Sequence, residues 1–234
     1  MAQFSRRGVR LVLSIALTAV AISPVRAQTI ISTTGGAPVG GFGKPEVQTF
    51  GQTITAPSDN ILNSFSFWLG PADGLVNASL TLEAYVYAWN PVTALATGSS
   101  LFTSAPFVYN ATPTSLYTQV MINTGGLALT TGDPYVLFLS SSGLAGSGEV
   151  SWDVAPTDQY AGGQFVFDFS AENPALFTTH TWATNWPPPG SDTHFEADFV
   201  SATVTPEPAT LVLLGTGLIG MVGFGLRRRK RQDA

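Results

Sequence analysis

The sequence predicts an all-β body of residues 28–205, an antiparallel β-sandwich of jelly-roll type, between an N-terminal signal peptide and one C-terminal transmembrane helix. Three observations lead to this prediction. Apolar residues alternate with a period of two through the body, and turn residues separate the alternating runs. The two ends are continuously apolar instead, and they carry nearly all of the positive charge.

Composition excludes several classes of protein. The chain has 234 residues, of which 44% are hydrophobic and 11% charged, and it has no cysteine. A chain this apolar is not intrinsically disordered, and its length is sufficient for a hydrophobic core. The lack of cysteine excludes a disulfide scaffold, a thiolate metal site and a cysteine nucleophile.

The charges are distributed very unevenly along the chain. Lys44 is the single Lys or Arg between residues 28 and 226, which also hold 14 carboxylates, so this interval has a net charge of −13. Binding to nucleic acid depends on Lys and Arg contacts to phosphate. We therefore expect no nucleic-acid partner.

The first 27 residues have the three parts of a secretory signal peptide. Three arginines within the first ten residues precede 12 apolar residues, 11–22, and the small residue Ala27 completes a cleavage site. The apolar run is shorter than the ~20 residues needed to span a bilayer. We expect the secretion machinery to export the chain and cleavage to follow Ala27. The pair Arg6-Arg7 also resembles a twin-arginine signal, but the residues after it favour the general secretory route.

Short runs of alternating residues predict roughly eight to ten strands in the body. The run from Tyr135 to Leu139 is apolar at every position, so we expect it to lie at the centre of a sheet with both faces covered. The Gly-rich segment 33–43 is predicted as a loop or a frayed edge, and the proline-rich segment 186–190 as a loop. The other predicted strands are centred on Phe65–Leu69, Leu80–Trp89, Leu116–Ile122, Phe165–Phe169 and Phe195–Ser201.

Residues 206–234 have a different pattern, in which three elements follow one another. Pro206, Glu207 and Pro208 form a rigid extended spacer, because each proline fixes its φ angle. Residues 209–226 then contain no charge and would form a transmembrane helix of about 27 Å. A basic tail follows, and its positive charges would stop transfer and stay in the cytoplasm. The tail consists of Arg227, Arg228, Arg229, Lys230 and Arg231.

This order of Pro-Glu-Pro, Gly-rich apolar helix and Arg-rich tail resembles the PEP-CTERM sorting signal. The resemblance implies that an exosortase, a membrane-embedded cysteine transpeptidase, recognises Pro206-Glu207-Pro208 and cleaves nearby. The precursor would lie in the inner membrane, and the processed body would reach the cell surface or the extracellular space, where exopolysaccharide is a further expected partner. From the residues alone, a permanent single-pass anchor is the alternative.

The body offers few residues for catalysis or metal binding. His180 and His194 are its two candidate bases at neutral pH, and strand alternation places His194, Glu196 and Asp198 on one face. A solvent-facing polar side of a half-buried strand gives the same pattern, and we favour that interpretation. The sequence also lacks a Gly-x-Ser-x-Gly elbow. We therefore predict no catalytic residues, no metal site and no cofactor, and a protein that is not an enzyme.

Aromatic side chains are the candidate sugar contacts. Tyr85, Tyr87 and Trp89 form a stripe on one face of a predicted strand, and Trp182 and Trp186 lie near the proline-rich segment. Exposed Trp and Tyr rings are rigid platforms on which a sugar ring can stack. The alternative for the stripe is a second buried face of a central strand, which we favour because sandwiches bury large aromatic residues.

Together these patterns predict an exported envelope or matrix protein with a structural or adhesive role linked to exopolysaccharide. A carbohydrate-binding module without catalysis is the alternative. A secreted hydrolase is a third class, less supported by the residues.

Overall fold

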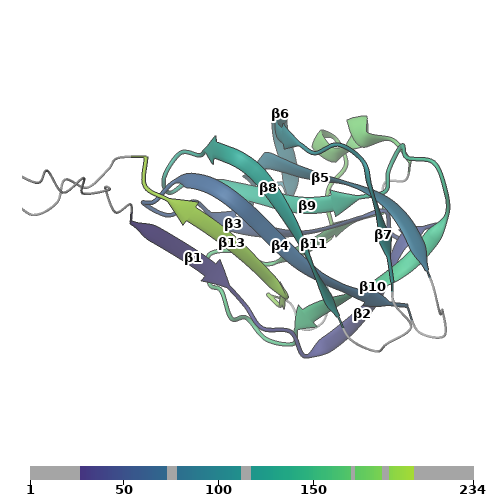
Figure 1. Cartoon of the computed structure of the whole chain (residues 1–234). Helices are drawn as coiled ribbons and strands as arrows, with labels where there is room; N and C mark the ends of the chain where they lie inside the picture. Colours follow the sequence, from purple (N-terminus) through teal and green to yellow (C-terminus); the bar gives the residue numbers. More distant parts are fainter. Residues whose placement is uncertain (1–26, 73–77, 112–116, 170–171, 186–189, 203–234) are drawn as a thin grey trace, which may run out of the picture. The chain divides into compact units, whose positions relative to one another are not determined.

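The computed structural model describes residues 27–72, 78–111, 117–169, 172–185 and 190–202. These residues form two antiparallel sheets packed as a sandwich (Figure 1), which confirms the predicted all-β architecture. The predicted transmembrane helix and basic tail lie outside the described residues, as does the signal peptide up to residue 26. In the part of the chain that is described, no helix has the length and apolar character to cross a membrane.

The first sheet has seven strands in the order β1-β13-β4-β10-β12, with β8 also paired to β4 and β2 to β10. The long strand β4 is its centre, since it pairs with β13, β10 and β8. The strands are β1 (Gln28–Ser32), β2 (Ala37–Lys44), β4 (Ile61–Pro71), β8 (Thr118–Ala128), β10 (Gly148–Ala155), β12 (Asp192–Thr193) and β13 (Phe195–Val200).

The second sheet has six strands in the order β11-β3-β9-β5-β6, with β7 also paired to β5. A short 3-10 helix, η1 (Pro174–Thr178), follows β11 in the chain. The strands are β3 (Thr49–Thr55), β5 (Ser79–Asn90), β6 (Leu95–Thr103), β7 (Phe107–Asn110), β9 (Pro134–Ser140) and β11 (Phe165–Asp168).

The predicted alternation is confirmed in both sheets. In β13 the residues Phe195, Ala197 and Phe199 are buried and the residues between them are half-buried. Strand β9 is buried on both faces from Tyr135 to Ser140 and lies between β3 and β5, the central position expected for a wholly apolar run.

Aromatic rings fill the space between the two sheets. Trp152 of β10 is fully buried, with its ring centroid 4.5 Å from that of Phe67, 5.3 Å from Phe42 and 5.7 Å from Phe50. The rings therefore interlock across the sandwich in edge-on and tilted pairs, the geometries that aromatic quadrupoles favour. No disulfide or metal is needed to hold such a core.

A second aromatic cluster lies on the other face of the six-stranded sheet. Phe177 of η1 packs on Tyr85, Phe138 and Trp182, with ring centroids 5.4, 5.0 and 6.2 Å away. The indole Nε1 of Trp182 donates to the carbonyl of Phe177 at 3.0 Å, which fixes the turn against the ring. Helix η1 therefore covers this face of the sheet.

Two details of the sequence prediction are wrong. The segment 33–43, predicted as a loop or a frayed edge, contains most of β2, an edge strand paired with β10, and its Val39 and Phe42 are buried in the core, so the loop alternative is wrong. The glycines that suggested a loop allow β2 to approach β10: Gly43 has φ +133°, and a Cβ there would lie 2.1 Å from the carbonyl oxygen of Gly148. The described residues also form thirteen strands instead of eight to ten, since several are too short to show alternation.

Both ends of the body meet at one place. Strand β1 pairs antiparallel with β13, with Gln28 opposite Val200, and the Ser201 amide donates to the Ala27 carbonyl at 3.1 Å. The hydroxyl of Ser201 donates to Asp59 at 2.5 Å, and that of Thr29 donates to the same carboxylate at 2.7 Å. These two hydrogen bonds lower the pKa of Asp59 below its ordinary value.

Candidate functional site

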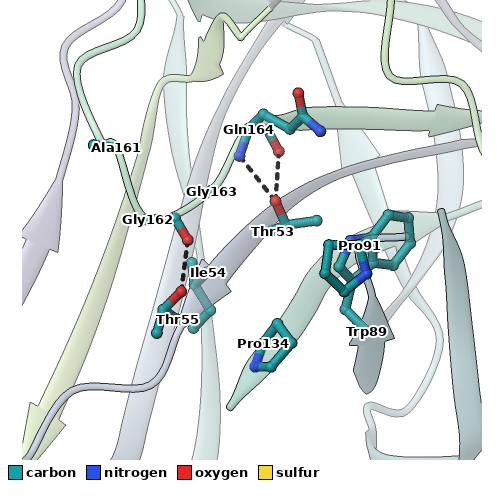
Figure 2. A pocket seen from close by; sticks show the side chains of 10 residues that line it. All are labelled: Thr53, Ile54, Thr55, Trp89, Pro91, Pro134, Ala161, Gly162, Gly163 and Gln164. Atoms are coloured by element: carbon teal, nitrogen blue, oxygen red, sulfur yellow. Dashed lines mark hydrogen bonds between the residues drawn. The ribbon is translucent and has the colours of Figure 1, made fainter. Parts of the chain in front are cut away.

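A hollow of about 250 Å³ opens at one end of the six-stranded sheet (Figure 2). Trp89, Pro91 and Pro134 supply its apolar wall, and Thr53 to Thr55 and the loop 161–164 supply the rest. None of the described residues that line it is charged. Its volume is below the ~300–1,000 Å³ of common small-molecule pockets, so it has room for a single small ring.

The hydroxyl groups in the hollow are already hydrogen-bonded within the protein. The Thr53 hydroxyl accepts from the Gln164 amide at 2.8 Å and donates to the Gln164 carbonyl at 3.2 Å. The Thr55 hydroxyl donates to the Gly162 carbonyl at 3.0 Å (Figure 2). These contacts hold the loop against β3, and they leave apolar contact as the main interaction the hollow can offer.

The predicted aromatic stripe lies mostly inside the second aromatic cluster. Tyr85 and Trp89 are 6% and 5% exposed, and Trp182 is 1% exposed. A stacking platform needs an exposed ring face, so these three rings do not form one on the surface. Tyr87 is half-buried, and Trp89 reaches solvent at the hollow. Trp186 lies outside the described residues.

Burial also changes the chemistry of Tyr85. Desolvation, followed by the hydrogen bond that its hydroxyl donates to Glu83 and the negative charge of that residue, raises the pKa of Tyr85. The phenol therefore stays protonated and acts as a donor that fixes Glu83. This role is structural.

His194 pairs with a carboxylate that the sequence pattern did not suggest. Its Nδ1 lies 2.7 Å from Oδ2 of Asp153 on β10, and its ring stacks on Trp68 with centroids 3.9 Å apart and planes 4° apart. The other carboxylate oxygen of Asp153 accepts from the Gly36 amide at 3.0 Å. Among the described residues, no group of three or more His, Asp and Glu side chains could hold a metal ion.

Asp198, which was grouped with His194 by alternation, has a different partner. It lies on the half-buried face of β13 and accepts from the Gln28 side chain at 2.8 Å. His194 itself lies between β12 and β13, outside both strands. Glu196 and Asp198 share the half-buried face of β13, and Asp198 and His194 bond to different partners.

His180 forms the second pair of this kind. Its Nδ1 is 2.7 Å from Oδ1 of Asp168, whose side chain is fully buried, and the imidazole is 51% exposed. The pair connects the end of η1 to β11 and lies apart from the residues of the hollow.

A buried carboxylate, Asp192, was missed by sequence reasoning. It is 0% exposed and accepts from the Gln52 side chain at 2.7 Å and from the amides of Gln159 and Tyr160 at 2.8 and 2.9 Å. Burial raises the pKa of Asp192, and the three hydrogen bonds oppose that effect. The hydrogen-bond partners of Asp192 are 32 to 140 positions away in the sequence, so a local sequence pattern could not predict these contacts.

The C-terminal residues 204–230 match the family model of the PEP-CTERM protein-sorting motif. This match includes Pro206, Glu207 and Pro208 and confirms the resemblance seen in the sequence. The motif marks the chain as an exosortase substrate and implies export and sorting to the cell surface.

Comparison of the whole chain with curated proteins and solved structures finds only distant similarity. No curated protein matches it. A similar solved structure is the clostridial cysteine protease Cwp84 after propeptide cleavage, at 10% identity and TM-score 0.44, covering 75% of this chain and 40% of that one. The cysteine protease and lectin-like domains of Cwp84, a surface layer associated protein of Clostridium difficile, match at 10% identity and TM-score 0.39, covering 67% and 32%. The chain thus spans less than half the length of these solved chains.

Proposed function

We propose that this protein is a non-catalytic structural or adhesive component of the cell envelope or extracellular matrix, linked to exopolysaccharide. The observation that carries the proposal is the sorting motif joined to an acidic β-sandwich. The motif implies delivery to the surface, where a high net charge keeps the body soluble.

The positions of the carboxylates support a role without catalysis. Glu149 accepts from the Gly41 amide at 2.9 Å, Asp153 holds Gly36, and Asp192 holds the loop at Gln159. A glycoside hydrolase would need carboxylates that face each other across a substrate cleft. Here these groups serve as acceptors for backbone amides, which stabilises loops between strands.

The finer features of the precursor belong to the same proposal. We infer a jelly-roll type of connection, supported by the way consecutive strands from β8 to β11 alternate between the two sheets. We also infer a signal peptide cleaved after Ala27, supported by the exposure of Ala27 and by β1 beginning at Gln28. N-terminal sequencing of the exported protein would give Gln28 as its first residue.

The function is tested in the producing cells by deletion and complementation. We expect loss of the chain to reduce the exopolysaccharide retained on washed cells, and we expect the intact chain to restore it. The Glu207→Ala variant, which alters the sorting motif alone, should accumulate as an unprocessed membrane precursor and fail to restore retention. Equal retention with and without the chain would contradict the structural role.

The hollow favours one second candidate, a carbohydrate-binding module. An uncharged wall of Trp89, Pro91 and Pro134 suits the apolar face of a neutral sugar ring. In gels containing the exopolysaccharide, Pro91→Glu at the wall should abolish retardation of the protein. Val92→Glu adds the same charge at a neighbour that is 91% exposed and does not line the hollow, so it should leave retardation unchanged.

A further inference from the structure

One side of the sandwich is free of charge. Glu83 and Asp133 bracket 49 residues that contain no Asp, Glu, Lys, Arg or His. This stretch supplies β6, β7 and β8 and most of β5. It also carries Leu101, Val108 and Met121, which are 43%, 56% and 54% exposed. A body with one lysine and 13 carboxylates between residues 28 and 205 thus has an uncharged, partly apolar side.

Strand β8 is the regular edge on this side. From Thr118 to Asn123 it pairs with β4 residue for residue, and among the described residues no strand pairs with its outer side. Such an edge presents a row of N–H and C=O groups that can accept another strand. Native proteins protect edges with Lys, Pro, inward charges or β-bulges, and the six residues from Thr118 to Asn123 contain none of these.

The neighbouring edges are less suited to pairing. Strand β7 has four residues. The pairing of β6 with β5 is interrupted between Val86 and Ala88 and keeps at most three consecutive pairs, whereas β8 keeps six with β4 before its register shifts between Leu62 and Ser64. Strand β11 carries the buried Asp168, and β1 lies next to Asp198 of β13.

We propose that two copies of this chain associate through antiparallel pairing of their β8 edges, an inference that goes beyond the function proposed above. The occupant is a second copy because antiparallel self-pairing is symmetric and each copy supplies the same uncharged strand. Because both copies are acidic, electrostatic repulsion limits which of their surfaces can come together.

The distances between charges favour this edge. In the seven-stranded sheet the carboxylates nearest to β8 are on β13 and β10, the two strands beyond β4: Glu196 and Asp198, and Glu149 and Asp153. Pairing at β8 would separate the β13 strands of the two copies by five strand spacings, about 24 Å. That distance exceeds the Debye length of about 8 Å at physiological ionic strength. Pairing at β1 would separate them by three spacings, about 14 Å, with stronger repulsion.

Cysteine scanning of the full chain tests the proposal, because the natural sequence contains no cysteine. The variants Thr118→Cys, Gln119→Cys, Met121→Cys and Asn123→Cys are each exported by the producing cells and mildly oxidised. A residue at the two-fold axis lies next to the same residue of the other copy, within disulfide range. A residue two positions from the axis lies about 13 Å from the same residue of the other copy, beyond the limit of ~7 Å. We therefore expect one position, or two adjacent ones, to form covalent dimer at least about tenfold more than the others.

The matched control is Ile30→Cys, on the edge strand β1 and 53% exposed, against 54% for Met121. Dimer formation at Ile30→Cys equal to that at the best β8 position would overturn the proposal, and so would uniform or absent cross-linking along β8.

A second variant tests the edge itself. Met121→Lys, added to the best of the other three cysteine variants, should reduce covalent dimer at least about tenfold, since a lysine on an edge strand opposes its pairing with another strand. Ile30→Lys in the same background should leave the yield unchanged. Equal yields with and without Met121→Lys would refute pairing at β8, even if the chain dimerises elsewhere.

Discussion

Replacing Phe177 with alanine tests whether η1 is part of the core. Phe177 is 1% exposed and packs edge-on against Tyr85, Phe138 and Trp182. Truncating a buried Phe to Ala typically costs about 3–5 kcal/mol, from lost transfer energy and from the cavity left behind. That is a large share of the ~5–15 kcal/mol by which domains are stable.

The assay is urea unfolding of residues 28–205 followed by tryptophan fluorescence. We expect the midpoint to fall with an unchanged slope, because the substitution lowers stability without changing the surface exposed on unfolding. The melting temperature should fall by on the order of 10 °C, from about 2–4 °C per kcal/mol for a chain of this size.

Phe169→Ala is the matched control. Phe169 is 59% exposed and keeps one edge-on ring contact, with Phe167 at 5.1 Å, so its loss should cost about 0.5–1 kcal/mol. If both variants lost the same free energy of unfolding, the packing of η1 on the sheet would contribute no burial energy. The interpretation of the second aromatic cluster as part of the core would then be wrong.

Three further predictions concern single polar or close-packed positions. The pKa of Asp192 is raised, so the folded protein binds a proton at this carboxylate more tightly than the unfolded chain does. The contribution of Asp192 to stability is therefore greatest in acid and declines as pH rises through the raised pKa. Asp192→Asn should remove that part of the pH profile of urea unfolding. Gly163→Ala places a Cβ 1.7 Å from the Thr53 carbonyl oxygen and should cost about 3 kcal/mol in the same assay, against under about 1 kcal/mol for Gly36→Ala, whose Cβ has 3.6 Å to its nearest atom. Asp59→Asn weakens the hydrogen bonds that join the two ends of the body and should speed hydrogen exchange of the β1 amides, with exchange in β9 unchanged as the internal control.

Alternation along single strands made much of the fold predictable. The wholly apolar run from Tyr135 to Leu139 indicated a central strand, and β9 is one. Local pattern failed where a strand exists because of its neighbour. Strand β2 is rich in glycine, and the positive φ angles of Gly41 and Gly43, with the close approach of Gly43 to Gly148 on β10, explain why glycine is needed there.

The candidate site was less predictable, because its contacts join residues far apart in the chain. His194 pairs with Asp153, 41 positions earlier, although Glu196 and Asp198 are close to it in sequence. The hollow is lined by Trp89 and by a loop more than 70 positions later in the chain. Periodicity within one strand does not predict a contact between two such distant segments. Burial of Tyr85 and Trp89, in contrast, followed from the ordinary preference of sandwiches for internal aromatic residues.

The pairing of β13 with strands on both sides has a mechanical consequence. A pull applied to the chain beyond Val200 enters the fold at the end of a strand that is hydrogen-bonded to β1 and to β4. A force directed along that strand loads these bonds in shear, so many must break together before the strand slides. A protein held by its C-terminal end in flowing water would therefore resist detachment better than one whose last strand could be peeled away bond by bond.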